Sequence, residues 1–254
     1  MTVTPAQRFS ATAAAYAATM APSLRPVAVE VVRRATLELN ELVLDVGTGT
    51  GIAAAAALGE GRRVTGIDAA PGMLEIARAD VPGARFREMD FGALDFEDGA
   101  FDVAIAVHCL LFATDQGAVL AEWLRVTRPR GRLSLSVPGP DAVTPTAIYA
   151  EIYACNGIDT NGRYPTPDAL AALVADAGWQ DVEVHADAST AITLPDADAF
   201  RTWREIGARG AATADFSPEQ QQALTDEMLA VTPHDTDGRL RIPFGTIYLT
   251  AGKR

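Results

Sequence analysis

The chain has 254 residues, which is long enough for one large α/β domain with additions and a sizeable core. Its formal net charge of −12 argues against nucleic acids and anionic membranes as partners, because phosphate contacts need clustered Lys and Arg. The sequence shows no apolar run of transmembrane length and no signal-peptide pattern. Its two cysteines, Cys109 and Cys155, are not spaced as a metal pair, so we expect no metal site and a cytoplasmic location.

Two helices are expected before the first strand. Residues 6–20 are rich in alanine and place Phe9 and Tyr16, seven residues apart, on one helical face. A second helix is expected over residues 23–37, with Pro26 tolerated in its first turn. Phe9 and Tyr16 are interpreted either as packing residues or as residues that face a ligand.

The first predicted strand and the turn after it form the motif on which the rest of the chain depends. Residues 42–46 form an apolar run, interrupted by the acid Asp45, that indicates a buried strand. The turn 47–51 reads G-T-G-T-G, and Ile52 with five alanines then indicates a closely packed helix. Glycines let the main chain approach a ligand, and the helix N-terminus offers it unpaired N–H groups. The motif therefore predicts a nucleotide-binding corner.

The spacing of the glycines leaves the kind of nucleotide open. The dinucleotide pattern G-x-G-x-x-G/A fails from Gly47 but fits from Gly49, through Gly51 to Ala54. Asp45 favours a different ligand, because a carboxylate would repel a pyrophosphate, whereas it can hold an ammonium group.

Two further strands end in candidate ligand-binding residues. The strand 63–68 ends in Asp68, about 20 residues beyond the glycine turn, where doubly wound folds place the acid that contacts a ribose. This position would contact the ribose of more than one kind of nucleotide, so Asp68 alone does not distinguish between them. The strand 103–107 is apolar throughout, as expected for a strand covered on both faces, and ends at His108. Ligands bind outside the carboxyl ends of such strands. We therefore interpret His108 first as a residue that borders the ligand and second as a candidate catalytic base.

The remaining elements complete an alternating pattern. A strand is expected over 84–89, a helix over 118–127, a turn over 128–132 and a strand over 133–137. Five strand–helix repeats predict a parallel sheet with right-handed crossovers. Beyond Pro138 the expected helices cover 144–154, 167–177, 200–208 and 218–231, and the expected strands lie near 182–184 and over 244–251.

The run Asp45–Gly51, D-V-G-T-G-T-G, resembles motif I of the class I S-adenosylmethionine-dependent methyltransferases, in particular their type 11, UbiE-like group. The segment 94–102 is similar to the family's L-P-F-x-D-x-S-F-D run, and 128–133 to its L-K-P-G-G-x-L turn. The segment 68–74 resembles D-x-S-x-x-M-L, except that Ala70 replaces the usual hydroxyl residue. A helix cap is therefore expected to be missing there.

The resemblance implies a Rossmann-like, doubly wound α/β fold. Its seven-stranded sheet would be mostly parallel with an antiparallel last strand, and helical lid insertions would be added to it. Residues 1–254 would form a single domain, with an N-terminal helical cap (1–40), a cofactor-binding core (41–137) and a substrate-side half (138–254). The implied cofactor is S-adenosylmethionine, with S-adenosylhomocysteine as product.

The resemblance also implies residue roles. Asp45 would hold the methionyl ammonium group, directly or through water, and Asp68 would hold the ribose. Asp90 would bond the adenine amino group, with Phe91 beside the base. The full set of candidate cofactor-binding residues is Tyr16, Asp45, Gly47, Thr48, Gly49, Gly51, Asp68, Ala69, Met73, Asp90, Phe91, His108 and Leu111.

The function implied is transfer of a methyl group to a small-molecule acceptor by in-line displacement, in a monomer or homodimer. A lid carrying Tyr16, Tyr149, Tyr153, Tyr164, Phe200 and Trp203 is expected to form an aromatic acceptor pocket. Two alternatives stay open at this point. One is an NAD-dependent oxidoreductase, and the other is a non-catalytic protein that binds S-adenosylmethionine.

Overall fold

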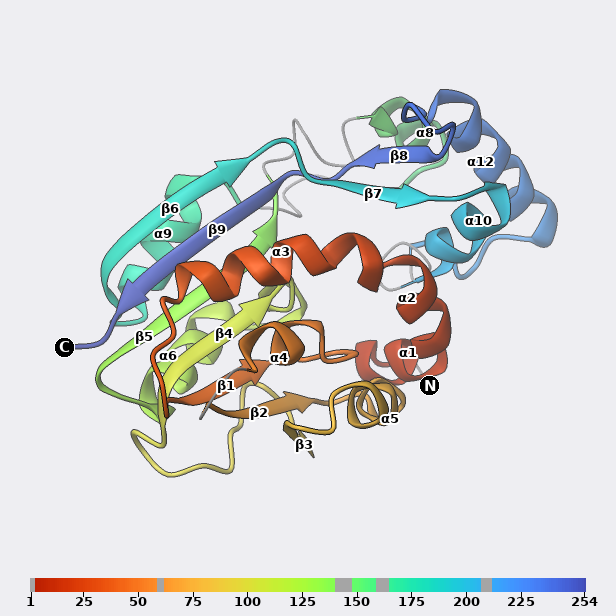
Figure 1. The fold of residues 1–254 in the computed structure, drawn as a ribbon. Helices are drawn as coiled ribbons and strands as arrows, with labels where there is room; N and C mark the ends of the chain where they lie inside the picture. The colour runs from red at the N-terminus through yellow and green to blue at the C-terminus, as the bar shows by residue number, and fades with distance from the viewer. Residues whose placement is uncertain (1–2, 59–61, 140–147, 159–164, 207–211) are drawn as a thin grey trace.

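A seven-stranded sheet forms the centre of the protein in the computed structural model, which describes residues 3–58, 62–139, 148–158, 165–206 and 212–254 (Figure 1). The strand order is β3-β2-β1-β4-β5-β9-β6, and β9 runs antiparallel to both of its neighbours. The strands are β1 (Leu42–Val46), β2 (Arg63–Asp68), β3 (Arg85–Glu88), β4 (Phe101–Val107), β5 (Thr127–Pro138), β6 (Gln180–Asp187) and β9 (Thr246–Gly252). The predicted fold class, with its antiparallel last strand, is confirmed.

Helices cover both faces of this sheet. One face carries α3 (Ala21–Arg34) and α4 (Ile52–Ala57), and the other carries α6 (Gln116–Val126) and α9 (Pro167–Asp176). Successive residues of β4 face opposite sides, so Val103 and Ile105 join the first layer while Ala104 and Ala106 join the second. This double coverage explains why β4 is apolar from Val103 to Val107.

The N-terminal helices differ from the sequence prediction. The single helix expected over 6–20 is divided into α1 (Pro5–Ala11) and α2 (Ala13–Thr19), because Thr12 leaves the helical region at φ −108° and ψ 15°. Helix α3 begins at Ala21 and ends at Arg34, so Pro26 lies inside the helix instead of in its first turn. Its buried face, which includes Leu24 and Val31, packs on the sheet and holds the helix together across the proline.

One other boundary moved because of pairing that the sequence does not show. Strand β5 begins at Thr127 and takes in the expected turn over 128–132, with a register shift opposite Phe101 and Val103. Helix α5 (Pro71–Asp80) packs beside β2 and β3.

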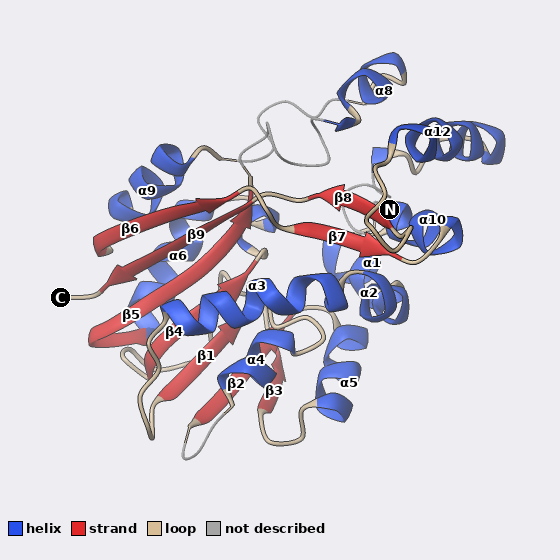
Figure 2. Ribbon diagram, turned by 45° about the horizontal axis from the view of Figure 1, so that its top comes forward, coloured by secondary structure: helices blue, strands red, loops and turns tan. Residues whose placement is uncertain are grey.

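A small cap lies beyond the carboxyl ends of the central strands (Figure 2). It consists of a two-stranded antiparallel sheet, β7 (Ala191–Leu194) with β8 (Leu240–Pro243), and three helices, α8 (Ala150–Cys155), α10 (Ala197–Glu205) and α12 (Pro218–Val231). The sequence predicted α12 with its observed bounds, placed α10 three residues late and missed β7 and β8. The expected helix over 144–154 falls partly on residues 144–147, which lie outside the described residues.

Candidate cofactor and acceptor site

A cavity of about 500 Å³ lies at the carboxyl ends of the sheet strands, under the N-terminal helices. Most of the residues proposed from the sequence line it. They are Tyr16, Gly47, Gly49, Asp68, Ala69, Met73, Asp90, Phe91, His108 and Leu111. Asp45, Thr48 and Gly51 do not line it and lie in or behind the loop that forms its floor.

The glycine loop keeps its shape through left-handed backbone and close packing. Gly47 has φ +64°, and a Cβ at this position would lie 2.5 Å from the Cβ of Cys109. Gly49 has φ +54°, but a Cβ there would meet nothing within 4 Å because it faces the cavity. The loop is tied to β2 by the Thr48 N–H, which donates to the Ile67 carbonyl at 2.8 Å. Gly47 is thus required because Cys109 leaves no room for a side chain, and Gly49 because a side chain there would occupy the cavity.

The carboxylate of Asp68 joins the loop to the next helix. One oxygen accepts the Gly49 N–H and the other accepts the Ala70 N–H, each at 2.9 Å. Burial raises the pKa of Asp68 above its ordinary value, and these backbone donors oppose the rise. A carboxylate oxygen can accept more than one hydrogen bond, so both oxygens remain able to bind hydroxyl groups in the cavity.

Asp45 lies behind the loop. It is 1% exposed, and its Oδ2 accepts a 2.6 Å hydrogen bond from the Thr48 hydroxyl. Burial raises the pKa of Asp45 to about 7, although the hydrogen bond from Thr48 acts in the opposite direction. The carboxylate does not reach the cavity wall. From this position it could contact the methionyl ammonium group through water but not directly.

The buried Asp45 should make stability depend on pH. Between its ordinary value of 3.8 and its folded value of about 7, the folded protein holds a proton that the unfolded chain has released. Its contribution to the free energy of unfolding should therefore fall as pH rises through this window. We expect a loss of about 2–3 kcal/mol between pH 5 and pH 7 relative to Asp45→Asn, measured by urea unfolding. Parallel pH profiles of the two proteins would contradict this.

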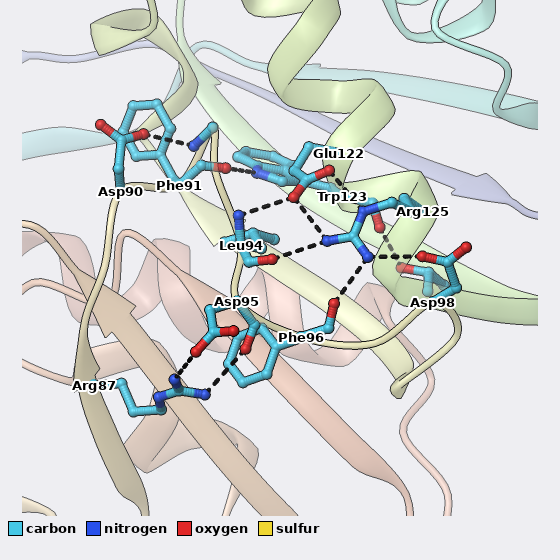
Figure 3. A network of polar contacts seen from close by, with 12 residues as sticks. Arg87, Asp90, Phe91, Leu94, Asp95, Phe96, Asp98, Glu122, Trp123 and Arg125 are labelled. Atoms are coloured by element: carbon cyan, nitrogen blue, oxygen red, sulfur yellow. Dashed lines mark hydrogen bonds and ion pairs between the residues drawn. The ribbon is translucent and has the colours of Figure 1, made fainter.

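The loop after β3 is held by α6 (Figure 3). The indole N–H of Trp123 donates to the Phe91 carbonyl at 2.9 Å. Arg125 donates to the carbonyls of Leu94 and Phe96 at 2.9 and 2.8 Å, and it is itself held by Glu122. These bonds fix the segment that begins with the predicted adenine contacts.

Asp90, at the start of this segment, is oriented by a neighbouring backbone group. Its Oδ1 accepts the N–H of Gly92 at 2.7 Å. Asp90 and Phe91 both line the cavity, next to the end formed by β2 and β3.

Helix α1 closes the cavity from above and is fastened to α5. Helix α5 has no side-chain cap of its own at Ala70, as the sequence predicted. Ser10 of α1 supplies the missing acceptor, because its Oγ accepts the Gly72 N–H at 2.9 Å. On the other side of α1, the Phe9 ring meets the Phe112 ring edge-on, with the centroids 5.1 Å apart.

Replacing Ser10 with alanine should loosen this closure. Loss of a helix cap costs about 0.5–2 kcal/mol, so we expect S-adenosylhomocysteine to bind roughly 2- to 30-fold more weakly in titration calorimetry. Thr12→Ala is the matched control, because the Thr12 hydroxyl bonds only to Arg8 within the same segment. Equal affinities for the two variants would show that the Ser10 contact does not secure the site.

His108 lies at the turn after β4 with φ +52°, a conformation uncommon for residues other than glycine and often found at functional sites. Its backbone N–H donates to the Ser136 carbonyl at 2.9 Å. The side chain is 8% exposed, and its ring lies 5.2 Å from that of Phe244. Burial lowers the pKa of His108 to about 3, so the imidazole is neutral at physiological pH.

Sequence reasoning missed part of the cavity wall. Met20, Leu24, Phe112, Ile206 and Phe244 line the cavity but belong to no recognisable motif. Their only sequence signal is that they are apolar, which does not distinguish them from core residues.

The expected aromatic lid is wrong for most of its members. Tyr149, Tyr153, Phe200 and Trp203 do not line the cavity; they are buried and pack against one another inside the cap. Large aromatic rings bury much apolar surface when they pack against one another, so these four rings fill the core of the cap and do not face the cavity. Tyr16 does line the cavity, and Tyr164 lies outside the described residues.

Known proteins resemble this chain along most of its length. The family model for the methyltransferase domain matches residues 44–135. Nocamycin O-methyltransferase from Saccharothrix syringae is 28% identical over 97% of each chain. Demethylmenaquinone methyltransferase from Thermus thermophilus is 36% identical over 54% of this chain and 73% of its own.

The fold has solved counterparts as well. Phosphoethanolamine N-methyltransferase 2 from Haemonchus contortus, solved with phosphomonomethylethanolamine and S-adenosylhomocysteine, has a TM-score of 0.59 and 18% identity. The likeness covers 90% of this chain and 52% of that one, and it shows the fold alone.

The chain belongs to the class I S-adenosylmethionine-dependent methyltransferases, and S-adenosylmethionine is its cofactor. This assignment replaces the NAD-dependent alternative. In the described part of the chain, none of the helices is both long and apolar enough to span a bilayer. The same residues contain no cluster of three or more His, Cys, Asp or Glu able to hold a metal ion.

Proposed function

We propose that this methyltransferase acts on a small-molecule acceptor, which binds beside the cofactor in the cavity described above. The observation that carries the proposal is the division of this single cavity between two sets of strand ends. Glycine and carboxylate residues lie over β1, β2 and β3, and a mainly apolar chamber continues over β4 and β5. A cavity of about 500 Å³ suits small ligands.

The residues at the first end fit S-adenosylmethionine. Gly49 leaves open space where any side chain would enter the cavity, so the main chain can pass beneath the methionyl part. Asp68 offers two oriented oxygens for the ribose hydroxyls, and Asp90 with Phe91 would hold adenine. Asp45, behind the loop, would hold the ammonium group through water, because the positive charge of the cofactor favours the ionised form of this carboxyl.

The protein's contribution is placement and exclusion of water. The cofactor supplies a methyl group made electrophilic by its sulfonium, for in-line displacement by a nucleophile held within roughly 3–3.5 Å. Helices α1 and α2 cover this space through Phe9 and Tyr16, whose ring centroids lie 6.1 Å apart. A dry site favours a reaction in which a positive charge is lost from the donor.

Two measurements test the proposal in sequence. Titration calorimetry should show binding of S-adenosylhomocysteine and none of NADH. Incubation with methyl-labelled S-adenosylmethionine and a library of small acceptors should then place label in a small product. Tight cofactor binding with no labelled product from any acceptor would favour the non-catalytic alternative, and label in protein or nucleic acid would refute a small-molecule acceptor.

A further inference from the structure

At the end of the cavity over β4 and β5, the described walls are mainly apolar. They are contributed by segments far apart in the sequence: α2 and α3, the ends of β4 and β5, the end of α10 and the approach to β9. The apolar residues at this end are Met20, Leu24, Val107, Pro138, Ile206 and Phe244. All of these except Pro138 are part of the hydrophobic cluster that extends under α3 and into the cap.

Fixed charges are confined to the opposite end. Among the described residues that line the cavity, the only charged side chains are Asp68 and Asp90, which follow β2 and β3. These two carboxylates are the ones assigned to the nucleoside. An ammonium, carboxylate or phosphate group that entered the far end would lose its hydration without meeting an opposite charge on any of the described lining residues.

His108, which follows β4, contributes a polar side chain to this end. Neither of its ring nitrogens has a hydrogen-bond partner, although both are buried. The neighbouring Phe244 ring offers no polar atom to them. A neutral imidazole has one donor and one acceptor, and buried groups of this kind nearly always have a partner in native proteins. His108 lines the cavity, and although its ring nitrogens are covered, a turn of the ring would let a bound ligand supply that partner.

Resting on the function proposed above, we propose that the acceptor is an uncharged, largely apolar molecule whose hydroxyl group hydrogen-bonds to His108. The unprotonated ring nitrogen accepts the hydroxyl proton and orients an oxygen lone pair. As the O–CH₃ bond forms and the S–CH₃ bond breaks, the electron pair of the broken bond stays on sulfur and the hydroxyl proton passes to His108. The positive charge lost from the sulfonium is then replaced by that of the imidazolium, so the site's net charge does not change.

The pKa of His108, lowered by burial to about 3, makes the imidazole a weak base, so proton transfer to it has to accompany the loss of the sulfonium charge. It keeps the imidazole unprotonated before the reaction throughout the physiological pH range. The low pKa also makes an isolated imidazolium unstable in the cavity. We therefore expect the proton to pass to solvent when the product leaves.

Three probes with the same ring system test the proposal: 2-naphthol, 2-naphthoate and 2-(aminomethyl)naphthalene. They share an apolar body and differ in the charge of the polar group. The first measurement uses the protein saturated with S-adenosylhomocysteine and records the ¹⁵N resonances of its imidazoles. The sequence contains three histidines, so His108 can be assigned by comparison with His185→Phe and His234→Phe.

We expect 2-naphthol to shift the His108 resonances and leave His185 and His234 unchanged. The charged probes should cause no shift at His108. With methyl-labelled S-adenosylmethionine, label should enter 2-naphthol. His108→Phe should lower kcat about 10²- to 10⁴-fold, as expected when a proton acceptor is removed, and should leave the affinity for S-adenosylhomocysteine within about threefold. His185→Phe is the control variant.

The outcomes separate this inference from the proposed function. Absence of a His108 shift with 2-naphthol overturns the inference, as does label entering the charged probes in preference to the naphthol. Unchanged kcat in His108→Phe overturns it too. In those cases transfer to some other small acceptor can still stand. Failure of the wild-type protein to bind S-adenosylhomocysteine would refute the proposed function itself.

Discussion

Asp68→Ala is expected to weaken the binding of S-adenosylhomocysteine roughly 30- to 1,000-fold, which corresponds to about 2–4 kcal/mol for two charge-assisted hydrogen bonds. The structure adds a second reason for a large effect. The same carboxylate accepts the N–H groups of Gly49 and Ala70, so its loss also frees the glycine loop. Titration calorimetry measures the affinity directly.

Asp95→Ala is the matched control for this change. Asp95 pairs with Arg87 on the surface, its side chain is 88% exposed, and its replacement removes the same charge without reaching the cavity. Its affinity should equal that of the wild type. If Asp68→Ala bound the ligand as tightly as Asp95→Ala does, Asp68 would have no place in the cofactor site.

Gly47→Ala should mainly lower the stability of the fold, and Gly49→Ala should mainly lower the affinity for the ligand, although both glycines lie in one turn with positive φ. An alanine in the left-handed region costs about 1–2 kcal/mol, and this applies to both. At position 47 the new Cβ would also collide with Cys109, which should bring the loss in the free energy of unfolding to about 2–5 kcal/mol. At position 49 the methyl group enters open space, so stability should fall only by the backbone cost.

Ligand binding should reverse this order. Gly49→Ala fills part of the cavity floor and should weaken S-adenosylhomocysteine binding even where the protein is fully folded. Urea unfolding and calorimetry on both variants measure the two effects. The double variant Gly47→Ala with Cys109→Gly should recover the steric part of the loss in a double-mutant cycle. Equal destabilisation by the two single substitutions would show that the contact with Cys109 is not what position 47 requires.

The residues near the glycine turn show how far the sequence alone can be interpreted. Strands β1 and β2 and helix α4 have the predicted bounds, and the residues predicted next to them, Gly47, Gly49 and Asp68, line one cavity. Each follows from a local rule. Apolar runs form buried strands, glycine allows a positive φ, and ligands gather at the carboxyl ends of parallel strands. The missing helix cap at Ala70 could be predicted as well, because an alanine side chain cannot accept a hydrogen bond at the N-cap position.

The N-terminal helices and the cap were less predictable because their shape depends on distant partners. The break at Thr12 turns α1 back onto α5, where Ser10 meets Gly72, a contact 62 residues apart in the sequence. The pairing of β7 with β8 joins segments nearly 50 residues apart and has no alternating pattern strong enough to reveal it. Register and burial at such distances are set by packing, which no local window contains.

The sequence by itself predicted the class of fold, and it predicted the glycine turn and Asp68 that line one end of the cavity, because these depend on short segments whose backbone geometry is set by their own residue types. Only the tertiary structure decided which side chains line the rest of the cavity. It buried Tyr149, Phe200 and Trp203 in the cap, and it placed Met20, Ile206 and Phe244 in the cavity wall that also includes His108. An apolar side chain carries no local signal of whether it will line a cavity or fill a core, because that outcome depends on which distant surfaces pack against it.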